Sequence, residues 1–447
     1  MSNKKFWSDW LFPVISLVIF AGLLAAMLLQ MSSIPVASLI SYSTGLLAYS
    51  MMLTVTFIGS RPRFIEKHFG MPSMFEVHGI MSIVLSFFVL IHVIIQWNGI
   101  QSISEMSTVS QTGWVAVIAL FLVMYTGIFS LSGIFVKHNR KLLTFKEKNN
   151  REVSLWLHRL AIVSVIFVYF HLFNLPFLVN NMPFMVILTG TTVYVLGYYA
   201  VWKIKVKFLP KYQVKSIYRG TPTIWTMELE PVEGKIPTYN PGEYYWIYFE
   251  DGDISREGHP FSTSSSITNR YNNSIEFMIK DAGDWTESLK NIKPGNKARL
   301  EGPHGDMYQP HIQALDESVP FVLLAGGIGL TPMLSIARHE REIGSQREIH
   351  LVWGLSWEED LFMLEELEEM QKENPNFHVH IIFSNEEVEG YPFGFISNEY
   401  LEEVGAAPYI DGHFFVCGPA PMIDATKRIL NHANVPHDQR HIDDFGF

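Results

Sequence analysis

The sequence predicts a multi-domain membrane protein: a six-helix transmembrane bundle, then a small antiparallel β-barrel and an α/β nucleotide-binding domain. Three observations support this fold class. Residues 1–202 are apolar and poor in charge, hydrophobic runs follow one another there, and the remainder changes to short alternating strands and then to strand–turn–helix patterns. The predicted domains are 1–207, 208–310 and 311–447.

Charge divides the chain at the same place as hydrophobicity. Residues 1–202 carry 12 Lys and Arg against 6 Asp and Glu, whereas the remainder carries 21 against 38. The second part is therefore typical of an acidic soluble globule, and no motif indicates nucleic acid or an obligate protein partner. Cys417 is the single cysteine, so an internal disulfide is excluded and a reducing cytosol is compatible with the sequence.

Six hydrophobic runs reach the length of a membrane-spanning helix, which is about 20 residues. They are Leu11–Met31, Pro35–Gly59, Phe75–Trp97, Gly113–Val136, Leu157–Val179 and Phe184–Trp202. Six such runs in succession are not typical of a soluble protein, so we expect a lipid bilayer around them. The first run follows Lys4 and Lys5 as a signal peptide would, but it is long and lacks a convincing cleavage site, so we keep it as a span.

The loops between these runs predict the orientation in the cell membrane. Cations gather on one side, at 4–5, 61–67, 137–151 and 203–207. The alternate connections contain no Lys or Arg; they are 32–34, 98–112 and 180–183. By the positive-inside rule, both termini and the two globular domains are expected in the cytosol.

Two predicted spans each contain a pair of histidines. His78 and His92 in the third span are fourteen residues apart, and His158 and His171 in the fifth are thirteen apart. At about 1.5 Å per residue, each pair is separated by roughly 20 Å along its helix. Hydrocarbon offers an imidazole no partner, so these residues are functional candidates. The spacing suits two stacked haems, with the metal ligands His78 and His158 near the inner face and His92 and His171 near the outer face.

The thirteen-residue spacing presents a geometric difficulty. Fourteen residues return to within about 40° of one helix face, but thirteen miss it by about 140°. We therefore expect an irregular turn in the fifth helix or differently oriented haems. Bis-imidazole ligation fills both axial positions of an iron and favours electron transfer over oxygen binding at the metal. Arg159, next to His158, is a candidate partner for a haem propionate and equally a candidate interfacial cation.

These histidines make the sequence resemble the NADPH oxidase and ferric reductase superfamily, whose membrane core has six spans and the same histidine spacing. The resemblance extends from about Phe75 to the C-terminus. It implies a bacterial NADPH oxidase-like transmembrane flavocytochrome b. In such a protein, electrons pass from NADPH or NADH through FAD and two b-type haems to an acceptor across the membrane. The resemblance does not identify that acceptor.

Short alternating runs over 212–305 predict the β-barrel. Its H-P-F-S-T segment offers the hydroxyls of Ser262 and Thr263 to a flavin, and K-D-A-G-D-W-T at 280–286 offers a cation and backbone N–H groups to a diphosphate. The order of these motifs resembles the FAD domain of the ferredoxin-reductase type, which often has Arg where this chain has Lys280. The candidate FAD-binding residues are His259, Pro260, Phe261, Ser262, Thr263, Lys280, Gly283, Asp284, Trp285 and Thr286.

After Pro320, an apolar strand, G-G-I-G-L-T-P and a helix predict a phosphate cradle, because only Gly lets the backbone approach so closely. The resemblance implies nicotinamide between this turn and a later C-G-P motif, with the thiol of Cys417 beside it. It also implies an aromatic near the C-terminus that covers the flavin; Phe445 matches best and Phe447 is the alternative. The candidate NAD(P)H-binding residues are Gly326, Gly327, Gly329, Thr331, Pro332, Gly418 and Pro419.

The electron acceptor and the nucleotide are less strongly indicated. Superoxide-forming members generally have a His where this chain has Gln96, which argues against oxygen, but the outer loops carry no cation to attract an anionic ferric chelate. We favour molecular oxygen, reduced to superoxide, with ferric reductase as the alternative. The segment L-S-W-E-E-D at 355–360 lacks the Arg typical of NADPH-selective members, so we expect weak discrimination between NADH and NADPH.

Overall fold

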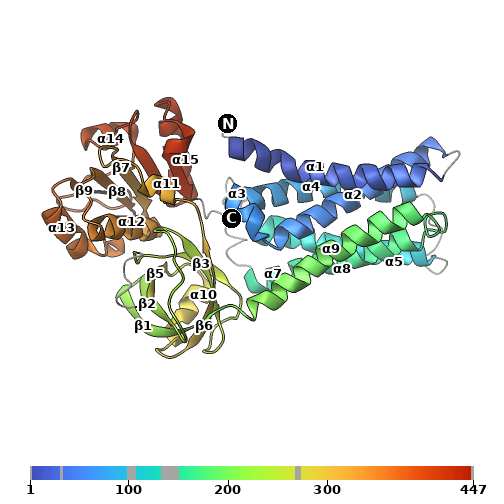
Figure 1. The fold of residues 1–447 in the computed structure, drawn as a ribbon, viewed down its shortest axis with the longest axis horizontal. Helices are drawn as coiled ribbons and strands as arrows, with labels where there is room; N and C mark the ends of the chain where they lie inside the picture. The colour runs from blue at the N-terminus through green and yellow to red at the C-terminus, as the bar shows by residue number, and fades with distance from the viewer. Residues whose placement is uncertain (1–2, 31–33, 98–106, 132–150, 267–272, 444–447) are drawn as a thin grey trace. The chain divides into compact units, whose positions relative to one another are not determined.

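The computed structural model describes residues 3–30, 34–97, 107–131, 151–266 and 273–443. The chain divides into two compact units, residues 1–207 and 208–446 (Figure 1). Phe445 and Phe447, the two candidates for an aromatic over the flavin, lie outside the described residues.

The first unit is helical, and among its described residues 6 helices are long and apolar enough to cross a membrane. This confirms the predicted transmembrane bundle and is typical of a multi-pass membrane protein. The helices are α1 (Asn3–Leu28), α2 (Val36–Gly59), α3 (Arg63–Phe69), α4 (Met71–Trp97), α5 (Thr108–Thr126) with the π-turn η2 (Gly127–Leu131), α7 (Arg151–His158), α8 (Leu160–Phe173) and α9 (Met182–Val206). The short α7 and the longer α8 together make the fifth span.

The fifth span is interrupted at Arg159, between its two histidines. The N–H of Arg159 is shared between the carbonyls of Leu155 and Trp156, both at 3.2 Å, and the N–H of Ile162 bonds to the carbonyl of Arg159 at 3.1 Å. Such i→i+3 bonds advance the chain about 20° further per residue than an α-helix does, which rotates His171 toward the face of His158. The irregular turn expected from the thirteen-residue spacing is therefore confirmed.

Helices pair closely within this unit. The third span, α4, packs along α2, and the fifth span packs along α5. Polar side chains tie the remaining helices to these pairs: Tyr49 and Thr192 share a hydrogen bond of 2.7 Å between α2 and α9. The amide of Asn181, which caps α9, donates to the carbonyl of Ala26 in α1 at 2.6 Å. Hydrogen bonds of this kind are typical of contacts between helices in lipid.

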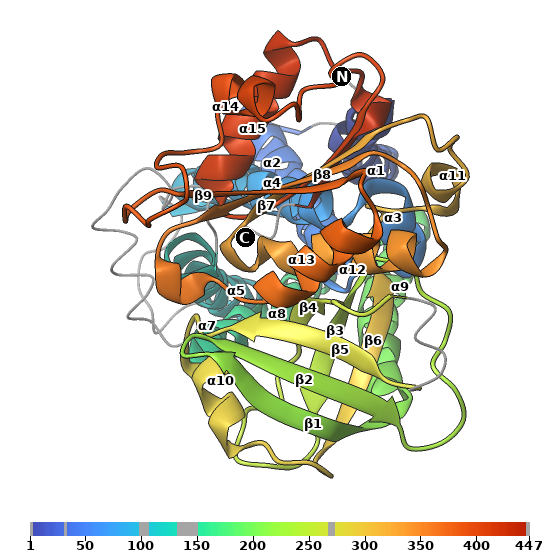
Figure 2. The same cartoon turned by 90° about the vertical axis from the view of Figure 1, so that its left-hand side faces the viewer.

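The second unit begins with a curved antiparallel sheet in the strand order β4-β3-β6-β1-β2-β5 (Figure 2). Its strands are β1 (Lys211–Thr221), β2 (Ile224–Pro231), β3 (Tyr244–Phe249), β4 (His259–Ser262), β5 (Ile275–Lys280) and β6 (Lys297–His304). The two edge strands meet, because Thr263 forms a bridge with Phe277 of β5 and the N–H of Ser264 bonds to the carbonyl of Glu276 at 2.9 Å. The predicted β-barrel is thus confirmed.

A parallel sheet in the order β11-β10-β7-β8-β9 completes the unit and confirms the predicted α/β domain. Its strands are β7 (Phe321–Gly326), β8 (Ile349–Leu355), β9 (Phe377–Phe383), β10 (His413–Cys417) and β11 (Arg440–Asp443). Its helices include α12 (Leu330–Glu342), α13 (Leu364–Glu373), α14 (Asn398–Glu403) and α15 (Ala420–His432). The strand order reverses between β7 and β10, and in open α/β sheets ligands bind at the carboxyl ends of the strands at such a point.

Helix α12 fastens the α/β domain to the barrel. The hydroxyl of Ser335 donates to the carbonyl of Ser265 at 2.6 Å and accepts from the N–H of Gly242 at 3.1 Å. One turn later, Arg338 donates to the carbonyl of Ser264 at 2.9 Å. All three barrel residues flank β3 or β4, so α12 contacts the strands that carry the candidate flavin motif.

The guanidinium of Arg338 also neutralises two carboxylates, one from each domain. It lies 2.6 Å from Glu276 of β5 and forms two bonds of 2.6 and 2.7 Å with Glu366 of α13. Burial by itself lowers the pKa of Arg338, but the bonds to Glu366 and Glu276 outweigh burial and raise that pKa. The three side chains are 17–21% exposed, so their charges depend on one another rather than on water.

Replacing Arg338 by Ala should lower the free energy of unfolding of the second unit by roughly 3 kcal/mol, because two largely buried carboxylates would lose their cation. Urea unfolding of the purified chain, followed by circular dichroism, measures this loss. Arg341→Ala is the matched control: this residue also forms a paired contact, with Glu373, but the side chains are 34% and 53% exposed. Exposed pairs contribute about 0–1 kcal/mol, so equal losses in the two variants would contradict the prediction.

Candidate functional site

The four histidines of α4 and of the fifth span face one another in two pairs. The ring centres of His78 and His158 are 6.1 Å apart, and those of His92 and His171 are 6.2 Å apart. An imidazole nitrogen lies about 2.0 Å from a bound metal and about 1.1 Å from its own ring centre, so two axial imidazoles on one iron have centres about 6.3 Å apart. Each pair therefore leaves room for one metal ion between its rings.

Every one of these rings is held by a backbone carbonyl on a neighbouring helix. The Nδ1···O distances are 3.0 Å for His78 and Val55, 2.8 Å for His92 and Ser41, 3.3 Å for His158 and Val123, and 2.7 Å for His171 and Val109. A carbonyl oxygen can only accept, so each Nδ1 carries the hydrogen. The lone pair then lies on Nε2, the arrangement that a metal-ligating imidazole needs. The donor set thus fits haem iron.

Glycines on the second and fourth spans lie beside all four rings, and two of them permit a close contact that a Cβ would obstruct. A Cβ on Gly45 would lie 2.9 Å from Nδ1 of His92, and one on Gly113 would lie 3.0 Å from Nδ1 of His171. At Gly59 and Gly127, which face His78 and His158, the nearest ring atoms would be 3.7 and 3.5 Å away. Sequence reasoning missed these glycines, although each span repeats them at a spacing of fourteen residues, the same spacing as the histidines of α4.

A polar network surrounds the ring of His92. The hydroxyl of Ser41 lies 3.2 Å from Nδ1 of His92, and the amide of Gln96 donates to that hydroxyl at 2.7 Å. Gln96 is exposed on its helix. Arg159 is half-buried just before the start of α8, next to His158.

Trp285 packs against one face of the candidate flavin strand β4. The rings of His259 and Phe261 stack on this indole, with centres 4.5 and 5.3 Å away. Trp285 is 6% exposed and belongs to the barrel core, so it holds the strand in place. Thr263 is also buried, and its hydroxyl donates to the carbonyl of Glu243 at 2.9 Å. Of the predicted set, His259, Pro260, Phe261 and Ser262 on β4 are partly exposed.

The candidate diphosphate motif forms the tight turn that starts helix α10 (Asp284–Glu287). Gly283 has φ 146°, which favours glycine, and open space lies where its Cβ would be. The hydroxyl of Thr286 accepts from the N–H of Ala282 and donates to the carbonyl of Gly283, both at 2.8 Å. Asp284 is exposed in the same turn.

Lys280, the predicted diphosphate cation, contacts the α/β domain in this structure. Its ammonium lies 2.7 Å from the carboxylate of Asp360, which also accepts from the hydroxyl of Thr223 at 3.2 Å. The Asp360 side chain is 6% exposed and that of Lys280 is 33% exposed. This ion pair is a second connection between the barrel and the α/β domain, and sequence reasoning assigned no role to Asp360.

The glycine turn after β7 lies against the C-G-P turn after β10. A Cβ on Gly329 would lie 2.2 Å from the carbonyl oxygen of Cys417, and one on Gly418 would lie 3.0 Å from Cα of Gly326. The two backbones therefore touch without side chains between them, and Pro419 and Met422 cover Gly326. Gly327 has φ 54° and open space on its Cβ side, as expected of a surface that admits a phosphate.

Other residues of the predicted nucleotide site are buried next to these turns. Thr331 and Pro332 are buried in the first turn of α12, and the Thr331 hydroxyl donates to the carbonyl of Ile328 at 2.9 Å. The indole N–H of Trp353 donates to the carbonyl of Gly327 at 2.9 Å. Cys417 ends β10 beside Ala325 of β7 and is 6% exposed. The thiol thus lies at the carboxyl ends of the two central strands, where the strand order reverses.

An acidic pocket of about 570 Å³ follows β8. It is lined by Trp357, Glu358, Glu359 and Glu386, and the Glu386 carboxylate accepts from the N–H of Glu358 at 3.0 Å. In doubly wound folds the end of the second strand approaches the adenine ribose of a dinucleotide. The pocket therefore places carboxylates where a 2′-phosphate would need a cation.

Comparison with known proteins agrees with this geometry for the second unit. Residues 226–313 match the FAD-binding domain family, and residues 323–428 match the oxidoreductase NAD-binding domain family. The chain is an oxidoreductase. Its FAD-binding and NAD-binding domains are of the ferredoxin-reductase type.

Two relatives and one solved structure illustrate the similarity. The reductase component of propane 2-monooxygenase from Rhodococcus jostii (strain RHA1) is 29% identical over 243 residues, which cover 52% of this chain and 62% of that protein. One component of the Na(+)-translocating NADH-quinone reductase from Actinobacillus succinogenes is 31% identical over 173 residues, 37% of this chain and 40% of that protein. The Amycolatopsis cytochrome P450 reductase GcoB is 22% identical with a TM-score of 0.47, covering 53% of this chain and 69% of that one. The chain therefore spans less than two thirds of the two relatives.

The acidic pocket predicts weak discrimination between the two nucleotides, with any preference in favour of NADH, because three carboxylates would repel a 2′-phosphate. Steady-state kcat/KM for the two nucleotides measures this. Glu359→Arg should raise the NADPH to NADH ratio about tenfold or more by supplying a phosphate partner. Glu387→Arg adds the same charge outside the pocket lining and should leave the ratio unchanged. A hundredfold preference of the unaltered protein for NADPH would contradict the prediction.

Proposed function

We propose that this protein carries electrons from NADH or NADPH, by way of FAD and two b-type haems, across a membrane to an acceptor on the far side. The observation that supports this most strongly is the pair of facing histidine couples in a helical unit of membrane type. Their spacing of 6.1 and 6.2 Å and the fixed hydrogen on each Nδ1 are what two bis-imidazole haems require. A matched FAD- and NAD-binding reductase unit on the same chain supplies the electron source.

Each histidine has its own role in this proposal. His78 and His158 would hold the inner haem, His92 and His171 would hold the outer haem, and Arg159 is a candidate partner for an inner propionate. When bound, FAD accepts a hydride from the nicotinamide and passes on single electrons, which the haems then carry. The protein's own contribution is position: carbonyls on α2 and α5 orient the imidazoles, and an iron held by two imidazoles would have no site open to the acceptor.

In the second unit, β4 and the turn at Gly283 would bind the flavin and its diphosphate. The turns at Gly327 and Gly418 would hold the nicotinamide nucleotide, with the Cys417 thiol nearby. Phe445, or else Phe447, would cover the flavin ring and move aside for the nicotinamide. Lys280 would have to leave Asp360 or share its charge with it in order to reach a diphosphate.

The distribution of cations supports a cytosolic position for both termini and for the second unit, by the positive-inside rule. Under that orientation His92 and His171 lie near the outer face. The outer connections 32–34, 98–112 and 180–183 carry no Lys or Arg. A neutral acceptor needs no electrostatic attraction, whereas an anionic ferric chelate would arrive without it. We therefore propose molecular oxygen as the acceptor and superoxide as the product.

Ferric reduction by the same electron path is the second candidate function. It is favoured by Gln96, which stands where superoxide-forming proteins generally have a histidine and which here bonds to Ser41 beside His92. An uncharged amide at this position would not stabilise the negative charge that oxygen gains when it is reduced to superoxide.

The haem assignment predicts two haems per chain. Extraction of haem from pure protein, with quantification by the pyridine haemochrome spectrum, should give a ratio of two. His92→Ala should lower it to one, because one iron loses an axial ligand. A single haem in the unaltered protein, or two in the variant, would disprove the assignment.

Glycine variants provide a finer test of the same assignment. Gly45→Ala should displace His92 and shift or weaken one haem signal, because its Cβ would lie 2.9 Å from Nδ1. Gly59→Ala, on the same helix, is the matched control, since its Cβ would meet His78 no closer than 3.7 Å, an ordinary van der Waals contact. Equal haem spectra in both variants would mean that the ring positions do not control haem binding.

The acceptor is tested by reoxidation. The protein is reduced anaerobically with NADH and then mixed rapidly with oxygenated buffer or with ferric citrate while haem absorbance is followed. Fast reoxidation by oxygen with a superoxide dismutase-sensitive signal is expected. Much faster reoxidation by ferric citrate without that signal would assign the protein as a ferric reductase.

A further inference from the structure

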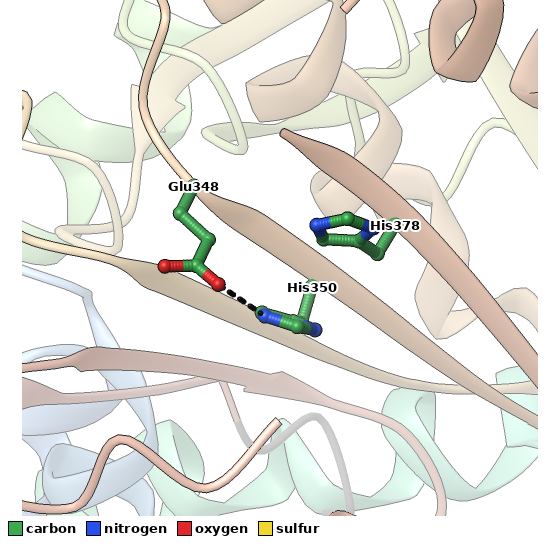
Figure 3. Close-up of side chains that lie close together, drawn as sticks. All are labelled: Glu348, His350 and His378. Atoms are coloured by element: carbon green, nitrogen blue, oxygen red, sulfur yellow. Dashed lines mark hydrogen bonds and ion pairs between the residues drawn. The ribbon is translucent and has the colours of Figure 1, made fainter. Parts of the chain in front are cut away.

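A second group of potential metal ligands lies on the parallel sheet of the α/β domain. Glu348 immediately precedes β8, His350 is its second residue, and His378 is the second residue of β9. His350 and His378 are direct partners in the parallel register, and residues 348 and 350 point to the same side of the sheet because side chains alternate along a strand. Figure 3 shows the three side chains gathered on adjacent strands.

The distances within this group match those of ligands on one ion. Oε1 of Glu348 lies 3.1 Å from Nε2 of His350, and the ring centres of His350 and His378 are 4.8 Å apart. One ligand atom from each of the three residues lies within 4.8 Å of the other two. Ligand atoms on a tetrahedral ion with bonds of about 2.0–2.1 Å are about 3.3 Å apart, so a small side-chain rotation closes the set.

A fourth side chain orients the central ligand. Nδ1 of His350 lies 3.3 Å from Nε2 of His380, on the opposite side of the ring from Glu348. If Nδ1 donates its hydrogen to His380, the lone pair of Nε2 points at the Glu348 carboxylate, and two acceptors then face each other. A cation between them removes that repulsion. Metal-ligating histidines ordinarily donate their other ring N–H to an acceptor, and Nε2 of His380 would be that acceptor here.

Burial favours the same interpretation. The His350 side chain is 7% exposed, whereas that of Glu348 is 58% exposed, so the group has one anchored ligand and one that can move to admit an ion from solvent. His350 is also covered by the chain at Gly405, whose Cβ would lie 3.7 Å from the ring. These contacts hold the central imidazole in its present orientation.

This group is separate from the nucleotide site. Glu348, His350 and His378 stand at the amino ends of β8 and β9, whereas the glycine turn and Cys417 stand at the carboxyl ends of β7 and β10. A seven-residue strand spans about 20 Å, so an ion here would not touch a bound nucleotide. The group is therefore free of any role in the proposed electron path.

We propose that Glu348, His350 and His378 bind one divalent transition-metal ion of the zinc type, with His380 as the residue that orients His350. Two imidazoles with one carboxylate select zinc and its neighbours over magnesium or calcium, which prefer oxygen ligands. The ion fastens the start of the edge strand β9 to β8, and solvent or a further group completes its coordination.

The test uses the full chain in detergent, stripped of metal with a chelator and titrated with Zn²⁺ in competition with a chromophoric chelator. The double variant E348Q/H378N should lose one equivalent of bound zinc or bind it at least tenfold more weakly. It should also lose the zinc-dependent rise in Tm of the unaltered protein. The matched control E389Q/H432N changes the same residue types at exposed positions outside the group and should behave as the unaltered protein does. Mg²⁺ should have no effect.

Identical zinc stoichiometry and affinity in the unaltered protein and in E348Q/H378N would overturn the proposal. Zinc-edge X-ray absorption of the unaltered protein with one equivalent of Zn²⁺ does not depend on how the variant folds. Scattering from two imidazoles is expected in that spectrum, and a shell of oxygen alone would reject the site.

Discussion

The hydrogen bond from each intramembrane imidazole to a backbone carbonyl is the interaction on which the helical unit depends. It fixes the tautomer, aims Nε2 across the bundle, and brings α2 against α4 and α5 against the fifth span. Side chains normally cover the carbonyls of a helix, and a Cβ at Gly45 or Gly113 would crowd the ring of His92 or His171, so glycine is required at these two positions. The glycines of α2 and of the fourth span recur at a spacing of fourteen residues, as do the histidines of α4. Paired helices can therefore repeat the same contact between a ring and a carbonyl.

Ion pairs connect the two domains of the second unit, whereas close contacts between helices hold the first unit together. Arg338 joins carboxylates from β5 and α13, and Lys280 of the barrel pairs with the nearly buried Asp360 of the α/β domain. Both contacts run between domains that bind different cofactors. In largely buried positions such pairs are costly to break on one side only, so they define one arrangement of the two domains.

Much of the architecture could be predicted because it depends on local periodicity. Six apolar runs, alternating strands and a strand–glycine–helix pattern are each recognisable within about 20 residues. The irregular turn at Arg159 is one of the two alternatives predicted from the number of residues between His158 and His171. The glycines opposite the histidines could not be assigned in the same way, because Gly45 meets His92 only after two helices have paired. Likewise, Trp285 belongs to a diphosphate-type motif in sequence, yet barrel closure buries it beneath His259 and Phe261.

Helix α12 begins at the glycine turn and, within its first three turns, is bonded to the chain that follows the flavin strand. A helix has a fixed rise of about 1.5 Å per residue, so α12 fixes the distance between the glycine turn and the chain that follows β4. If FAD and the nucleotide bind at these two regions, α12 would set the distance between them before either one binds. Nucleotide binding would leave this distance unchanged, and the movements it requires would be those of side chains such as Lys280.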